Sequence, residues 1–93
     1  MFSGCESVKE FIIPEDVVTI DEEAFSGCSS LEKVTIPSTV EIISAGAFKN
    51  CKSLEEILFE GTKEDWEANE LGDDWNKGIA AMAVKCVNGY VWF

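Results

Sequence analysis

The stretch AFSGCSSLEKVTIPSTVEII, residues 24–43, decides the fold, because imperfect copies of it stand on both sides of it in this 93-residue chain. Like residues recur at a constant step of 23 positions. The recurring columns are Phe2, Phe25 and Phe48; Cys5, Cys28 and Cys51; Val8, Leu31 and Leu54; Phe11, Val34 and Ile57; and Ile13, Ile36 and Phe59. A fixed period of this length indicates a solenoid, in which each coil stacks its apolar side chains over those of the next coil.

Each copy contains the pattern of a short strand. In the middle copy, polar and apolar residues alternate over residues 33–36, which is typical of a strand with one buried face. Pro37 then ends the strand, because proline has no N–H to donate to a neighbouring strand, and Pro14 holds the matching place in the first copy. Gly27 and Asn50 precede the cysteines, where we expect a left-handed backbone that reverses the chain.

The repeated pattern [AM]-F-x-[GN]-C-x-S-[LV]-x-x-[VFI]-x-[IF]-P resembles the BspA-like subclass of bacterial leucine-rich repeats over roughly residues 1–60. The cysteine three positions before the first leucine favours this subclass. The chain departs from the general pattern LxxLxLxxNxL, because Thr39 stands in the asparagine place and Val40 comes one position early. The resemblance implies an α/β, β-rich leucine-rich-repeat solenoid of about three right-handed coils with a parallel sheet. It also implies a secreted or cell-surface bacterial protein that adheres to other proteins.

The sequence changes character after Phe59, where Glu60-Gly61 replaces the proline and the 23-residue step stops. We therefore expect one domain, with leucine-rich repeats over residues 1–60 and a C-terminal cap over residues 61–93. Thr62 and Asp65 have the spacing of a capping box for a helix from Lys63 to about Leu71, which Gly72 would end.

A hairpin is predicted at the end of the chain, with strands over residues 84–87 and 90–93 joined by an Asn88-Gly89 turn. The segments GTKEDW, DDW and VKCVNGYV also resemble the C-terminal cap of BspA-like arrays. The last coil of a solenoid exposes its apolar cross-section, so we expect large residues of the cap to cover it. The candidates are Trp66, Trp75 and Trp92.

The charge of the chain limits its partners. Seven basic and 18 acidic residues, with no histidine, give a net charge of −11, which repels nucleic-acid backbones and anionic membranes. Apolar runs such as residues 79–84 are far shorter than the roughly 20 residues that span a bilayer. The N-terminus also lacks the basic flank and apolar stretch of a signal peptide. We expect a soluble chain with no nucleic-acid partner, no membrane insertion and no signal peptide of its own.

The sequence offers little for catalysis or for metal binding. Three of the four cysteines recur once per repeat, and there is neither a CxxC motif nor a histidine to complete a zinc site. We expect buried free thiols, which disfavours the thiolate that a nucleophile needs. Adjacent carboxylates such as Glu22-Glu23 and Asp73-Asp74 are typical of a solvated face. We therefore expect no enzyme activity, no catalytic residue, no metal and no cofactor.

Two further ligand hypotheses have weaker support. Asp73, Asp74 and Asn76 carry oxygens that suit calcium, but they lack the spacing of a known calcium loop, so a solvated turn is favoured. Trp75 or Trp92 could stack on a sugar ring, which requires at least one exposed indole. We expect these tryptophans to pack in the core instead.

The N-terminal end of the array is expected to be open. Met1 falls in the column of Ala24 and Ala47, so the chain starts partway through a coil and leaves the core layer of Phe11 and Ile13 uncovered. An uncovered edge invites pairing. We expect a fragment of a longer array, or self-association of two copies through this open N-terminal edge; the first is favoured.

The candidate binding surface is the solvent side of the stacked strands, the concave strand face of such a solenoid. Alternation places Ile12, Thr35 and Leu58 in one exposed column, and Glu10, Lys33 and Glu56 in another. Three strands offer on the order of 250 Å², against about 800 Å² per partner in a standard interface. The function expected is a protein-interaction or adhesion module that binds an unidentified protein. A structural cap with no binding role of its own is the alternative, and carbohydrate binding ranks third.

Overall fold

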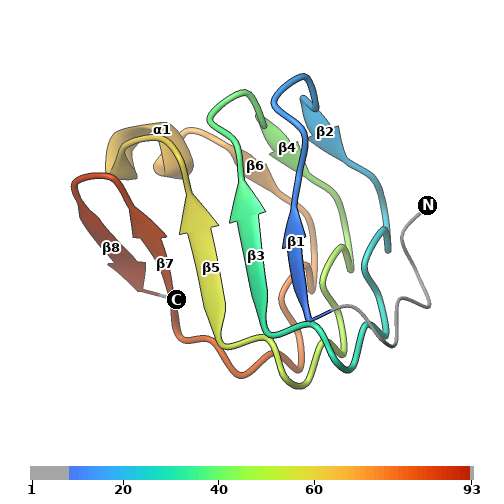
Figure 1. Ribbon diagram of the computed structural model, residues 1–93. Coiled ribbons are helices and arrows are strands. Elements are labelled where there is room, and N and C mark those ends of the chain that lie inside the picture. Colours follow the sequence, from blue (N-terminus) through green and yellow to red (C-terminus); the bar gives the residue numbers. More distant parts are fainter. Residues whose placement is uncertain (1–8, 93) are drawn as a thin grey trace.

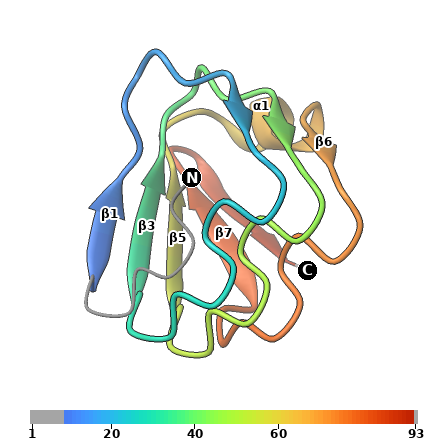
Figure 2. The same cartoon turned by 90° about the vertical axis from the view of Figure 1, so that its right-hand side faces the viewer.

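The computed structural model describes residues 9–92, which form a solenoid with two β-sheets on opposite sides of its core (Figures 1 and 2). The larger sheet has the order β1-β3-β5-β7-β8 and the smaller one the order β2-β4-β6. The elements are β1 (Glu10–Ile12), β2 (Thr19–Ile20), β3 (Lys33–Ile36), β4 (Ile42–Ile43), β5 (Glu56–Phe59), α1 (Lys63–Glu67), β6 (Glu70–Leu71), β7 (Ala83–Cys86) and β8 (Gly89–Trp92). The predicted solenoid with a parallel sheet is confirmed. Phe2, Cys5, Val8 and Phe93 lie outside the described residues.

The register of the strands confirms the 23-residue step. Phe11 pairs with Val34, and Val34 with Ile57, across β1, β3 and β5. The ladder continues outside the strands, where the Phe25 N–H donates to the Ala47 carbonyl at 2.7 Å. Backbone hydrogen bonds therefore hold successive coils in one register through the turns as well as through the sheets.

An aromatic column runs through the core along the solenoid axis. The rings of Phe25 and Phe48 stack with centroids 4.9 Å apart and planes 6° apart. Phe11 lies at one end of this pair, at 5.4 Å from Phe25, and Trp75 lies at the other end, at 6.2 Å from Phe48 in an edge-to-face arrangement. Both geometries are favoured for aromatic pairs, so this column stabilises each coil against the next.

The predicted reversal points are confirmed by the backbone. Gly27 and Asn50 have φ of 78° and 64°, in the left-handed region that glycine and asparagine tolerate best. Pro37 directly follows the last residue of β3, as predicted. In the next coil Glu60 takes the place of this proline, and its N–H donates to the Ile36 carbonyl at 2.9 Å.

The parallel pairing of coils continues past residue 60, although the 23-residue step stops there as predicted. β7 pairs in parallel with β5, with Ile57 opposite Val84, and β6 pairs in parallel with β4, with Ile43 opposite Leu71. The step lengthens to 27 residues from Ile57 to Val84 and to 28 residues from Ile43 to Leu71, because this coil contains the extra helix α1. The ring of Trp75 continues the aromatic column beyond Phe48. The division of the chain at residue 60 stays a prediction.

Helix α1 begins where it was predicted and ends earlier. The Asp65 N–H donates to Thr62 Oγ1 at 3.1 Å and the Thr62 N–H donates to the Asp65 carboxylate at 3.3 Å, which completes the capping box. Trp66 is buried, as expected, in edge-to-face contact with Phe59 and Trp75. The helix ends at Glu67 rather than near Leu71, because Glu70–Leu71 form β6 against β4.

The hairpin forms with its loop one position earlier than predicted. Cys86 pairs with Gly89, so the two-residue loop is Val87-Asn88, and Gly89 opens β8 with φ of 141°. The inward residue of β8 is Val91, opposite Val84, and the alternation along the strand therefore turns Trp92 to solvent. The expectation that Trp92 covers the core was wrong, since its exposed fraction is 71%.

Gly72 is required by close packing rather than by a helix end, which generates a prediction. A Cβ at this position would collide with the backbone of Ala45 and lie 2.6 Å from the carbonyl carbon of Ser44. We expect Gly72→Ala to lower the free energy of unfolding by about 1–3 kcal/mol, because the adjacent coil cannot move away. Gly27→Asn is the control, since Gly27 has open space and the next repeat carries Asn50 at this place. Equal urea midpoints for the two variants would contradict the prediction.

Candidate functional site

The six predicted surface residues lie together on one side of the larger sheet, which we call the outward face because it points away from the core. Ile12, Thr35 and Leu58 are direct neighbours across β1, β3 and β5. Glu10, Lys33 and Glu56 form the second row by the same register. All six are exposed or half-buried, while the residues between them, such as Val34 and Ile57, are buried.

The structure extends both rows by two strands, which sequence reasoning missed. Lys85 lies beside Leu58, and Tyr90 lies beside Lys85. By the same register Ala83 follows Glu56, and Trp92 lies opposite Ala83. The available signal was the alternation of residues 83–86 before a hairpin turn. The repeat did not reveal this strand, because the step from β5 to β7 is 27 residues rather than 23.

The enlarged outward face carries exposed apolar groups at both edges. The exposed fraction is 73% for Ile12 on β1, and 54% and 71% for Tyr90 and Trp92 on β8. The rings of Tyr90 and Trp92 lie 6.1 Å apart with planes inclined by 29°. Five strands offer on the order of 400 Å², about half of one partner's share of a standard interface.

A hollow of about 300 Å³ lies on this face over β5 and β7. Ala83 and Leu58 give it apolar surface, and Tyr90 borders it from β8. Its full lining is Glu55, Glu56, Ile57, Leu58, Ala83, Lys85 and Tyr90. Ala83 lies between the larger residues Glu56 and Trp92 of its row, and its short side chain accounts for the depression.

Helix α1 positions the hairpin that carries Tyr90 and Trp92. The Lys63 N–H donates to Asn88 Oδ1 at 2.8 Å, and Asn88 Nδ2 donates to Glu64 Oε1 at 3.2 Å. A hydrogen bond from its own backbone and the one from Asn88 lower the pKa of Glu64. The hairpin loop is therefore tied to the first turn of the helix, which is itself anchored in the core by Trp66.

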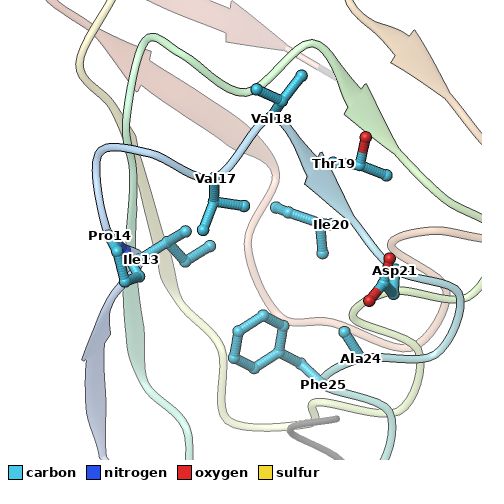
Figure 3. Close-up of a pocket in the computed structure, with 9 residues that line it drawn as sticks. All are labelled: Ile13, Pro14, Val17, Val18, Thr19, Ile20, Asp21, Ala24 and Phe25. Atoms are coloured by element: carbon cyan, nitrogen blue, oxygen red, sulfur yellow. The ribbon is translucent and has the colours of Figure 1, made fainter.

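A second hollow, of about 280 Å³, lies at the N-terminal end of the core (Figure 3). It is mostly apolar, with Val17, Ile20 and Phe25 turned toward its interior in Figure 3. Ile13 was expected to be uncovered here, but its exposed fraction is 3%, because it packs within the core cluster. Val18, with an exposed fraction of 47%, lies at the rim.

Cys28, Cys51 and Cys86 are buried, and Cys51 and Cys86 are free thiols, as predicted. Cys51 Sγ donates to the Phe25 carbonyl at 2.9 Å, which links two coils. Burial raises the pKa of the Cys51 thiol to about 12 and also raises the pKa of Cys86. Within residues 9–92, no group of three or more cysteine, aspartate or glutamate side chains could hold a metal ion. Asp73 and Asp74 are exposed in a turn.

The raised thiol pKa values predict low reactivity. Because the thiolate is the reactive form, a pKa of about 12 leaves almost none of it on Cys51 at pH 8, and the raised pKa of Cys86 lowers its thiolate fraction as well. We expect Cys51 and Cys86 to resist iodoacetamide in the native protein at pH 8 and to react fully in guanidinium chloride. Peptide mapping by mass spectrometry measures each site separately. Rapid labelling of native Cys51 would contradict the burial described above.

Comparisons with known proteins agree with this geometry. The chain belongs to the family described as BspA type leucine rich repeat region, whose six-copy pattern matches residues 1–71. It is similar in structure to a leucine rich cell surface protein from Faecalibacterium prausnitzii A2-165, with 42% sequence identity and a TM-score of 0.70. The similarity covers 72% of this chain and 18% of that protein, so the chain corresponds to a small part of its relative. No curated protein matches the chain.

The family match supports a protein-interaction module, which is what leucine-rich repeats commonly form. Among the described residues, no helix has the length and apolar character needed to cross a bilayer.

Proposed function

We propose that this chain is a protein-binding module of a secreted or cell-surface bacterial protein, and that it adheres to a protein partner through the outward face. The observation that carries the proposal is the exposure of Ile12, Tyr90 and Trp92 on one face, with charged residues between them. Large exposed apolar groups within a polar surround are typical of interaction surfaces.

The cellular location of the chain and the strength of its binding belong to the same proposal. The relative from Faecalibacterium prausnitzii is called a cell surface protein, which supports a surface location for this chain. An outward face of about half the standard interface area supports weak binding by this segment alone. A non-enzymatic role is favoured, because burial suppresses the thiolates and the chain has no histidine.

A matched pair of triple variants tests the proposal. Ile12, Thr35 and Leu58 are changed to lysine on the outward face, one residue on each of three strands. The control changes Thr19, Ile42 and Leu71 to lysine, which are exposed, one on each strand of the smaller sheet. Both variants add three positive charges, so effects of net charge cancel in the comparison.

The immobilised chain is incubated with surface proteins released from bacteria and from epithelial cells. We expect the outward-face variant to capture at least about tenfold less protein than the unchanged chain does. The reason is that its three lysines would be buried in the interface, where unpaired charges oppose association. The control should retain it. Equal retention by both variants would instead support the alternative, a structural cap that seals the array through Trp66 and Trp75.

We also propose that two copies associate through the apolar hollow of Figure 3 at high concentration. Covering Val18 and the adjoining apolar surface would remove it from water. Light scattering across a concentration series should show a dimer that Val18→Asp abolishes, because a carboxylate is costly to bury at such a contact. Val87→Asp is the control, since Val87 is also exposed, at the opposite end, in the hairpin loop. A monomer at all concentrations would exclude this association.

A further inference from the structure

Tyr90 and Trp92 are the aromatic residues of the described chain that the core leaves most exposed. Phe25, Phe48, Trp66 and Trp75 all lie in the core with exposed fractions of 6% or less. On β8 the inward position belongs to Val91, which packs against the core cluster, so the two exposed rings are not needed to close the solenoid. The two rings, whose planes are inclined by 29°, instead offer solvent exposed aromatic surface of a kind that favours planar groups.

The hollow beside Tyr90 adds acidic groups to this aromatic surface. Glu55 and Glu56 line it, and both are exposed in the free protein. Lys85 is the one basic side chain in the lining, so the hollow carries a net charge of −1. Lys33 lies on the adjoining strand beside Glu56. A chain of net charge −11 adds a long-range field that draws cationic partners toward the surface.

We propose that this hollow binds an arginine side chain from a basic segment of the protein partner. The guanidinium group is planar, so it can stack on Tyr90, and its N–H groups can donate to the carboxylates of Glu55 and Glu56. The apolar surface of Leu58 and Ala83 suits the methylene stem of the same side chain. This inference rests on the proposed function, because the arginine belongs to a protein ligand.

The charges distinguish this occupant from others. A lysine ammonium can satisfy the carboxylates, but it is a compact point charge that gains less from a flat aromatic surface. A neutral oligosaccharide can stack on the rings, but it gains nothing from the field of an acidic chain. Arginine uses both features, and Lys85 is then a repulsive neighbour rather than a ligand.

The test uses the whole chain labelled with 15N and a tetra-arginine peptide as the probe, followed by NMR titration at low salt. Tetra-lysine, tetra-citrulline and cellotetraose are titrated in parallel as probes of charge, shape and sugar binding. We expect tetra-arginine to shift the amide signals of Leu58, Ala83 and Tyr90. It should bind more tightly than tetra-lysine, and tetra-citrulline should bind at least about fivefold more weakly.

Single variants then test which side chains of the hollow contact the arginine. Tyr90→Ala and Glu56→Gln should each weaken tetra-arginine binding about two- to fivefold, by loss of stacking and of a carboxylate. Lys85→Gln should tighten it about twofold, because it removes a repelling charge. Lys77→Gln is the matched control, since it removes the same charge from an exposed turn that does not line the hollow. It should change the affinity less than Lys85→Gln does.

Three results would overturn the inference. The first is equal affinity for tetra-arginine and tetra-lysine with shifts spread over all acidic surfaces, which would indicate general charge attraction. The second is a stronger response to cellotetraose, which would indicate a sugar site. The third is weaker binding on Lys85→Gln. If tetra-arginine fails while the outward-face lysine triple still abolishes protein capture, the proposed function stands and this inference alone is wrong.

Discussion

The register between successive coils is the constraint on which the rest of the structure depends. Each coil presents the same apolar side chain to the same place in the next, as in the stacked pair Phe25 and Phe48. The backbone fixes this alignment through interstrand pairing and through hydrogen bonds in the turns. A shift of one residue in the pairing of a strand would exchange its inward and its outward side chains. One register therefore sets the core and the outward face together.

Helix α1 shows how the solenoid accommodates a change in its period. It adds residues to one coil, yet β7 still pairs in parallel with β5. The insertion carries Trp66 into the core against Phe59 and Trp75, so the last coil is covered by large rings. Its first turn also bonds to Asn88 in the hairpin loop. The same short helix thus closes the core and holds the strand that presents Tyr90 and Trp92.

The outward face combines groups that come from distant parts of the sequence. Ile12 and Trp92 belong to the two edge strands of one sheet, and Glu56 and Lys85 line one hollow between these edges. In the acidic chain this face is distinguished by its exposed rings rather than by its charge alone. Burial of the thiols and the apolar core leave the exposed polar chemistry of the described residues mainly to carboxylates, lysines, hydroxyls and amides, beside these rings. That composition suits recognition of a partner surface.

The sequence by itself determined the repeat, its inward columns and the left-handed turns at Gly27 and Asn50. It also determined the two exposed rows that begin at Ile12 and Glu10. A fixed period makes this possible, because the same local pattern recurs in each coil. The sequence also determined the capping box of α1. Only the tertiary structure decided that the coil continues through Val84, that Gly72 lies against Ala45, and that Trp92 faces solvent. The physical reason is that these features depend on which distant segments pair after the step changes, and a change of step leaves no periodic signal from which that pairing can be predicted.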